Sequence, residues 1–346
     1  MKPASGVAVL ALLAVSGLWS ADFPRAEIYN GEVRAIVYLP DAARGFYRAT
    51  RFDWSGVIGS LVYRGHEYYG QWFQSVDPKV RDFTYDGPDI VASPCTAITG
   101  PAEEFVGPGN TALGYDETQK GGTFTKIGVG VLRRPDDSAY NRFTSYEIVE
   151  TGRWTIRTHP DAVEFVQDLK DSSSGYGYVY TKTVRLAKGE PEMVLEHTLE
   201  NTGRRPIDTT AYNHNFLWLD HQPPGPDFTI AVPFDIKSDR PPSPDFAEIR
   251  GNKVVYRKVL QDRDRVAIPV QGFGDSPKDY DIRIENARLG VGMRITGDRP
   301  LLSESLWSIR AVLAIEPFVK IAIAPGSQFT WTIAYRYYTI PSAGHN

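Results

Sequence analysis

Alternation between apolar and polar residues is the feature that most constrains the fold of this chain of 346 residues. From Phe329 to Tyr337 every second residue is aromatic or Ile, and Thr330 and Thr332 stand between them. A period of two is that of a β-strand whose two faces meet different surroundings. Similar or strongly apolar segments, separated by turns that contain Gly or Pro, are 33–38, 163–169, 176–186, 193–200, 209–219, 229–236, 253–260, 282–295 and 312–323.

Helical periodicity is missing from the chain beyond its first 21 residues, where no stretch of about 12 residues repeats with a period of 3.6. Many strands without helices predict an all-β protein, a large antiparallel β-sandwich of two sheets packed face to face. The Pro-rich stretches 222–227 and 239–245 have strand-like sequence on both sides, so we interpret them as loops. We therefore expect residues 22–346 to form a single domain.

The first 21 residues have a different character. Lys2 precedes an apolar run at 7–15, and small residues follow it at 16, 17, 20 and 21. This order is typical of a secretory signal peptide, and the run is short for a membrane span. We expect the protein to be exported, either to the periplasm or into the medium. The alternative is an uncleaved leader that anchors the protein through residues 7–19.

Composition and motif content exclude several classes of function. The net charge of -4 provides no basic surface for nucleic acid. Cys95 is the single cysteine, which rules out an intrachain disulfide and a cysteine-based zinc site. The sequence contains no phosphate-binding loop, no dinucleotide fingerprint, no G-x-S-x-G and no H-E-x-x-H. We therefore expect neither a metal nor an organic cofactor.

A histidine within an aromatic strand is the first candidate for chemistry. Alternation places His214 on the same face as Tyr212, Phe216 and Trp218. One interpretation is a hydrogen-bonded histidine of the core. The other is an acid–base imidazole on an aromatic platform, a surface on which the apolar face of a sugar packs well.

A carboxylate within an apolar strand is the second candidate. Glu316 follows Val312, Leu313 and Ile315. Burial of an unpaired carboxylate is costly, and it raises the pKa toward the range that suits a general base. The structural alternative is a buried ion pair, for example with Arg310.

These two segments resemble motifs of the galactose mutarotases (aldose 1-epimerases). Asn213-His214, followed by Phe216 and Leu219, is similar to the N-H-x-(aromatic)-x-x-L segment of that family. Ile315-Glu316-Pro317 resembles the family's C-terminal Glu segment, and about a hundred residues separate the two, as in the family. The resemblance implies a large two-sheet sandwich with a sugar site in the concave face of one sheet.

The resemblance also implies a reaction, the interconversion of aldose anomers without any cofactor. Glu316 would act as base on the anomeric hydroxyl and His214 as acid on the ring oxygen, from opposite sides of the reacting unit. The partner would be a monosaccharide or the end of a glycan, not nucleic acid. The other expected contacts to the sugar are Arg51 (early in the chain, as in the family), Lys126 and Asn213, with stacking on Trp54, Phe216 or Trp307.

The chain departs from the family at one position. Related epimerases carry an earlier histidine in an H-G-F-A-R stretch, and the nearest counterpart, Gly122–Lys126, contains none. The missing imidazole would come from His197 or His66, or be lacking altogether. Two alternatives to an epimerase therefore stay open: a protein that binds carbohydrate without turnover, and a glycan-cleaving hydrolase or lyase. A hydrolase would need a second carboxylate. Candidates for it are Glu196, Glu304 and Asp53.

Overall fold

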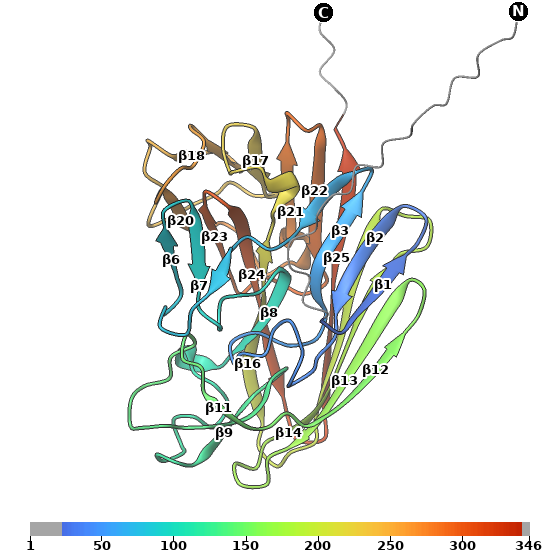
Figure 1. Cartoon of the computed structure of the whole chain (residues 1–346), viewed down its shortest axis with the longest axis vertical. Helices are drawn as coiled ribbons and strands as arrows, with labels where there is room; N and C mark the ends of the chain where they lie inside the picture. The colour runs from blue at the N-terminus through green and yellow to red at the C-terminus, as the bar shows by residue number, and fades with distance from the viewer. Residues whose placement is uncertain (1–22, 341–346) are drawn as a thin grey trace, which may run out of the picture.

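A computed structural model describes residues 23–340 of the chain (Figure 1). Between these two residues the chain is almost entirely β, with three short 3-10 turns and no α-helix, which confirms the predicted fold class. The 3-10 turns are η1 (Pro108–Asn110), η2 (Leu219–His221) and η3 (Pro277–Asp279). The expected signal peptide at 1–21 lies outside the described residues. No helix within 23–340 is long and apolar enough to cross a membrane.

A five-stranded antiparallel sheet forms the middle of the molecule (Figure 1). Its strand order is β20-β23-β24-β16-β8, so strands that are far apart in sequence become neighbours. The bounds are β20 (Arg265–Val270), β23 (Ser303–Ile309), β24 (Val312–Ile323), β16 (Ile207–Phe216) and β8 (Gly100–Val106).

A ten-stranded sheet packs against one face of the five-stranded sheet. Its order is β12-β13-β14-β15-β25-β22-β21-β17-β19-β18, and it runs from β12 at the right of Figure 1 to β18 at the upper left. The bounds are β12 (Arg153–Thr158), β13 (Ala162–Lys170), β14 (Gly177–Leu186), β15 (Glu192–Asn201), β17 (Phe228–Ala231), β18 (Ala247–Arg250), β19 (Lys253–Tyr256), β21 (Asp281–Asn286), β22 (Val291–Gly297) and β25 (Gln328–Thr339).

Three smaller sheets complete the structure. They have the strand orders β1-β2-β3-β4, β5-β7-β6 and β11-β10-β9. The bounds are β1 (Arg25–Tyr29), β2 (Val33–Tyr38), β3 (Val57–Tyr63), β4 (His66–Tyr69), β5 (Ser75–Val76), β6 (Phe83–Asp86), β7 (Asp89–Ala92), β9 (Thr123–Lys126), β10 (Gly130–Arg133) and β11 (Glu147–Glu150).

The alternation in β25 explains how the two large sheets pack. Trp331, Tyr335 and Tyr337 are buried, whereas Arg336 on the opposite face is exposed. The Tyr335 hydroxyl donates a hydrogen bond to Oδ1 of Asn215 on β16, over 2.9 Å. The face of β16 that carries Asn215 therefore points between the sheets, and alternate residues of β16 point away from the ten-stranded sheet.

Some strands differ from the predicted segments. The segment 282–295 is not one strand, because a turn separates β21 from β22. The Asn286 side chain accepts a hydrogen bond from Leu289 N, and Gly290 closes the turn with a φ of +68°. The predicted strands 229–236 and 253–260 end early, at Ala231 and Tyr256. Strands β8, β20 and β23 of the five-stranded sheet are absent from the prediction.

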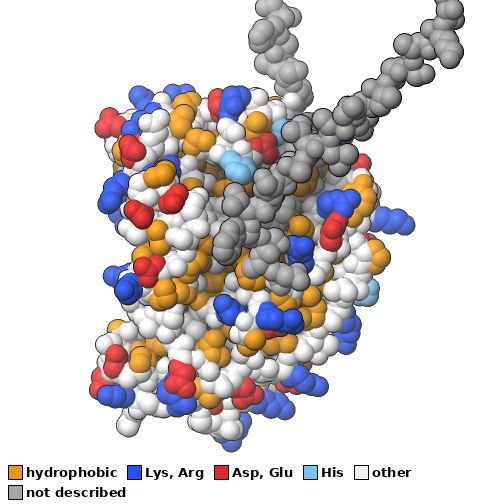
Figure 2. All heavy atoms as spheres, in the orientation of Figure 1, with side chains coloured by type: hydrophobic (Ala, Val, Ile, Leu, Met, Phe, Trp, Pro, Cys, Tyr) orange, Lys and Arg blue, Asp and Glu red, His pale blue; other side chains and the backbone are white. Residues whose placement is uncertain are grey.

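Charged side chains of both signs are interspersed over the face of the molecule drawn in Figure 2. The net charge of the whole chain is small, at -4. Neither sign predominates on this face.

Candidate active site

Strand register brings His214 and Glu316 together. Tyr212 on β16 pairs with Phe318 on β24 in an antiparallel ladder, so the next residues on the same faces, His214 and Glu316, lie opposite each other. His214 Nε2 is 3.0 Å from Glu316 Oε1. Two side chains about a hundred positions apart therefore form one contact, on the face of the sheet that points away from the ten-stranded sheet.

The pair lines a cavity of about 150 Å³. Of the residues expected at the site, this cavity brings together Glu316, His214, Arg51, Phe216 and Trp307. The remaining lining residues are Asp82, Phe83, Thr96, Phe143 and Arg265. The small volume leaves room for a single small molecule, and the lining combines aromatic rings with side chains of both charges.

Aromatic rings surround the imidazole of His214. The Phe216 ring stacks on it with centroids 3.7 Å apart and planes 10° apart. The ring of Trp307 meets it edge to face at 5.6 Å. Behind Phe216, the ring of Trp72 continues the stack at 5.5 Å. Trp218 was expected on this face, but β16 ends at Phe216, and the Trp218 ring lies against His221 instead.

Burial raises the pKa of Glu316 above its ordinary value. Three groups oppose this effect: the Ser305 hydroxyl, which donates to Glu316 Oε2 over 3.0 Å, and the nearby charges of Arg51 and Arg142. Arg310 is not a partner of Glu316, because its guanidinium donates to backbone carbonyls, including those of Pro88 and Asp262. The carboxyl of Glu316 is therefore easier to protonate than a carboxyl in water.

Burial also lowers the pKa of His214 well below its ordinary value, and the charges of Arg51 and Arg142 lower it further. Its Nδ1 atom is buried and has no hydrogen-bond partner within the described residues. Burial therefore favours the neutral form of the imidazole, and its Nδ1 atom is left without a partner among residues 23–340.

Glu104 holds the arginine of the site in place. Its fully buried carboxylate accepts hydrogen bonds from Arg51 Nε at 2.9 Å and from the Tyr212 hydroxyl at 2.5 Å. Lys126 Nζ and Arg142 Nη1 lie at 3.3 Å. Burial raises the pKa of Glu104, but these three cations together outweigh burial and hold it well below its ordinary value. The carboxylate stays ionised and fixes the guanidinium of Arg51 at the cavity wall.

Three residues expected at the site are placed away from the cavity. Lys126 is buried beside Glu104 and donates to Phe105 O over 2.7 Å, and burial lowers its pKa to about 8. Trp54 is buried and donates from Nε1 to Ala49 O over 2.8 Å. Asn213 lies on the opposite face of β16, directed between the two large sheets.

Neither proposed substitute for the missing histidine reaches the cavity. His197 stacks on Trp331 at 4.4 Å, and its Nε2 is 2.9 Å from Glu103 between the large sheets. His66 contacts Asp220 at 2.6 Å in a separate part of the structure. Within residues 23–340, His214 is the one histidine that lines this cavity.

The second carboxylate of the cavity is also not one of those expected. Glu196 pairs with Arg185 at the surface, and Asp53 pairs with Lys182 in the interior. Asp82 lines the cavity, and the Thr96 hydroxyl donates to it over 2.7 Å. Asp82 lies in a loop without a recognisable motif, so no sequence signal indicated it. Across residues 23–340, no three His, Cys, Asp or Glu side chains are grouped to hold a metal ion.

Comparison with known proteins identifies the fold. No protein-family model and no curated protein sequence matches the chain. Solved structures do match, among them a galactose mutarotase related enzyme from Lactobacillus acidophilus, with a TM-score of 0.52, 12% identity, and coverage of 92% of this chain and 98% of that one. An aldose epimerase homologue from C. elegans has a TM-score of 0.51, 14% identity, and coverage of 91% and 99%. At such identities the likeness defines the architecture, a galactose mutarotase-like β-sandwich.

Proposed function

We propose, from the galactose mutarotase-like fold and the contact between His214 and Glu316, that this protein interconverts the anomers of an aldose. The observation that carries the proposal is the distance of 3.0 Å between His214 Nε2 and Glu316 Oε1 in a cavity lined by Phe216 and Trp307. The similar structures are described as galactose mutarotase related or as aldose epimerase homologues, which supports a carbohydrate as the ligand.

The reaction needs two proton transfers at one carbon. A proton leaves the C1 hydroxyl while another reaches the ring oxygen, the ring opens, C1 rotates, and closure reverses both transfers. The two oxygens share C1, so a carboxyl and an imidazole in mutual contact can reach both from one edge of the sugar. This geometry differs from the expectation that the two groups act from opposite sides of the reacting unit.

The shifts in the pKa values of Glu316 and His214 support the role of Glu316 as base and of His214 as acid. When Glu316 accepts the anomeric proton, it becomes neutral, and burial favours its neutral form. Burial also makes the imidazolium of His214 a stronger acid, which suits donation to the ring oxygen. The pair is competent when it holds one proton between its two members, and it titrates as a unit. Ring closure exchanges the two roles.

The cavity favours a single sugar ring. Its volume of about 150 Å³ is below the range of about 300–1,000 Å³ that is usual for drug-sized ligands. Trp307 and Phe216 provide the stacking surface, and Arg51 and Asp82 are placed to bind hydroxyl groups. The substrate that we propose is therefore a monosaccharide, or the terminal ring of a glycan.

The proposal includes export of the protein. The leader-like sequence at 1–21 supports passage across a membrane, with residues 22–346 as a single mature domain. An exported enzyme would meet free sugars, and their slow mutarotation would be its target.

Binding of sugar without turnover is the second candidate. The observation that favours it is that no second histidine among the described residues lines the cavity. A platform of Phe216 and Trp307 would bind a sugar without any proton transfer. The two candidates share the cavity and differ in whether the contact between His214 and Glu316 does chemistry.

Equilibration of freshly dissolved α-glucose and α-galactose, followed by polarimetry or NMR, tests the proposal. The protein is expected to accelerate equilibration, and Glu316→Gln and His214→Asn are each expected to reduce the acceleration by about 10²–10⁴-fold. Glu196→Gln, at the surface, is the matched control and should change nothing. Sugar binding by calorimetry without any acceleration would assign the protein to the binding class. An acceleration that both site variants retain would place the chemistry elsewhere.

A further inference from the structure

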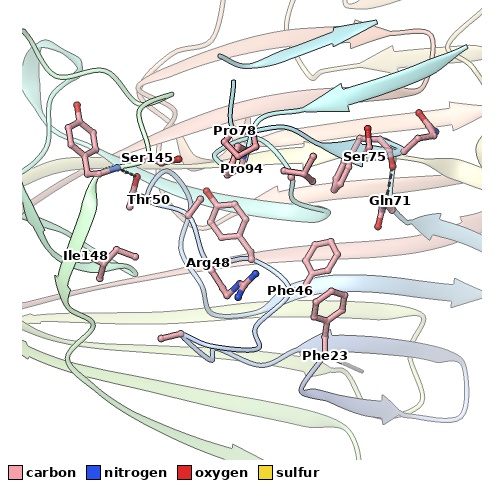
Figure 3. Close-up of a pocket in the computed structure, with 18 residues that line it drawn as sticks. Phe23, Phe46, Arg48, Thr50, Gln71, Ser75, Pro78, Pro94, Ser145 and Ile148 are labelled. Atoms are coloured by element: carbon pink, nitrogen blue, oxygen red, sulfur yellow. Dashed lines mark hydrogen bonds between the residues drawn. The ribbon is translucent and has the colours of Figure 1, made fainter. Parts of the chain in front are cut away.

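A second, larger cavity lies apart from the candidate active site. It has a volume of about 650 Å³ and lies among four segments of the chain (Figure 3). These segments are 42–50, 71–78, 94–97 and 145–148, and Phe23 closes one side. None of its lining residues lines the smaller cavity of His214 and Glu316. A ligand there would occupy a second, separate site.

The lining of this large cavity is predominantly apolar. In Figure 3 the rings of Phe23 and Phe46 lie beside the side chain of Arg48, with Pro78, Pro94 and Ile148 around the hollow. Phe23 and Phe46 meet edge to face at 5.3 Å. The volume is within the range of about 300–1,000 Å³ in which small organic ligands are usually bound.

Arg48 is the one charged side chain among the described lining residues. Its Nη1 donates to Ala43 O over 2.6 Å, and no carboxylate of residues 23–340 lies within salt-bridge distance of its guanidinium. A guanidinium beside apolar rings, with its remaining donors directed at no anion, matches a carboxylate or a sulfonate. The positive charge of Arg48 therefore favours an anionic ligand.

Hydrogen bonds of Tyr47 join the chain segments between the two cavities. The Tyr47 ring lines the large cavity, and its hydroxyl accepts hydrogen bonds from the backbone N–H of Arg51 at 3.3 Å and of Phe52 at 3.1 Å. The same hydroxyl donates to Cys95 O over 3.1 Å. Tyr47 therefore links the chain segments that lie between the two cavities.

We infer that the large cavity binds an amphipathic organic anion, an aromatic or aliphatic body that carries one acidic group paired with Arg48. The inference does not depend on the proposed sugar chemistry, because the two cavities share no lining residue. The apolar body would pack on Phe46 and Phe73, and the acidic group would replace water around the Arg48 guanidinium.

Two probes that differ only in charge test the inference on the full chain. Anilinonaphthalene sulfonate carries the apolar rings and an anion, and phenylnaphthylamine carries the rings alone. The sulfonate probe is expected to bind saturably with one molecule per chain, detected by fluorescence titration. Arg48→Gln should weaken it roughly tenfold and should leave the neutral probe within about twofold. Arg48 is exposed, so this variant is expected to fold.

A second variant locates the probes in the cavity. Ala42 is exposed and lines the cavity, and Ala42→Trp should fill the cavity and weaken both probes at least about tenfold. The control is Arg44→Gln, whose exposed arginine lies outside the lining and should leave both affinities unchanged. Equal weakening of both probes by Arg48→Gln would overturn the anion requirement. Binding that neither variant alters would overturn the site. Failure of both probes to bind would also overturn the inference.

Discussion

Glu103 and Glu104 are consecutive residues of β8 whose carboxylates enter two separate ion networks on opposite sides of the sheet. Glu103 points between the large sheets, with Lys182 Nζ at 3.0 Å and His197 Nε2 at 2.9 Å. Glu104 points to the other face and pairs with Arg51. Both are buried. One strand therefore links the interior of the sandwich to the wall of the candidate site.

Replacement of Glu104 should destabilise the fold. Glu104→Gln leaves Arg51, Arg142 and Lys126 without their common carboxylate, and breaking a buried ion pair costs about 3–5 kcal/mol. Because the pKa of Glu104 is lowered by folding, its contribution is present above the unfolded pKa of about 4.5 and is lost as the pH falls below it. The free energy of unfolding in urea, measured at pH 7 and at pH 3, checks both statements.

The control for Glu104 is an exposed ion pair, that of Asp208 with Lys320. Asp208→Asn should cost less than about 1 kcal/mol. A Glu104→Gln variant that is no less stable than this control would show that the three cations find other partners, and the buried network would then not support the site.

Arg142 should control the pH dependence of catalysis. Its charge lowers the pKa of both His214 and Glu316. Arg142→Gln is therefore expected to move both limbs of the pH–rate profile of the proposed sugar equilibration to higher pH. Arg142 is not part of the cavity lining, so KM should change little. The exposed Arg157→Gln is the control. A profile that does not move, or that moves to lower pH, contradicts the electrostatic account.

The buried carboxyl of Glu304 is expected to lower the free energy of unfolding at neutral pH. It is buried, neither carboxyl oxygen has a hydrogen-bond partner within residues 23–340, and burial raises its pKa to about 8. Because folding raises the pKa of Glu304, the contribution of this carboxyl to stability is present below the unfolded pKa of about 4.5. It is lost as the pH rises through about 8. Glu304→Gln is therefore expected to stabilise the protein at pH 7 by on the order of 2–3 kcal/mol.

Chemical denaturation at pH 4 and pH 7 checks the prediction for Glu304. The gain from Glu304→Gln should be large at pH 7 and close to zero at pH 4. The exposed Glu200→Gln should show no such difference between the two pH values. A variant that is less stable than the wild type at both pH values would mean that the carboxyl of Glu304 makes contacts that Gln cannot make.

The strands predicted from alternation alone are those whose two faces meet different surroundings and whose sequence shows it. β25 and β15 alternate visibly because one face is buried and the other is not. β8 could not be predicted, because all seven of its residues are buried and its sequence does not alternate. Glu103 and Glu104 were missed with it. Their roles depend on cations that lie on the two faces of the strand, and the local sequence does not reveal these partners.

The residues of the candidate site also fall into those that the sequence indicates and those that it does not. His214 and Glu316 each stand out as a polar residue in an apolar strand, and sheet register then brings them together. Asp82 and Arg142 lie in loops, and their positions depend on contacts that no local pattern encodes. Lys126 was expected to contact the sugar because it is the basic residue of Gly122–Lys126, the counterpart of the family's H-G-F-A-R stretch, and the structure directs its charge to Glu104.

Trp307 is the residue whose replacement best separates binding from chemistry. Its ring lines the cavity and meets His214 edge to face at 5.6 Å. If a sugar stacks on it, Trp307→Ala should weaken sugar binding roughly tenfold and lower kcat much less, because no proton passes through the indole. Trp307→Phe keeps a ring at this position and should recover most of the affinity. Calorimetric titration with the sugar and the KM of equilibration measure the effect, and thermal unfolding confirms that each variant is folded. A kcat that falls while KM stays constant would mean that Trp307 positions His214 without contacting the sugar, and the stacking surface would then be Phe216 alone.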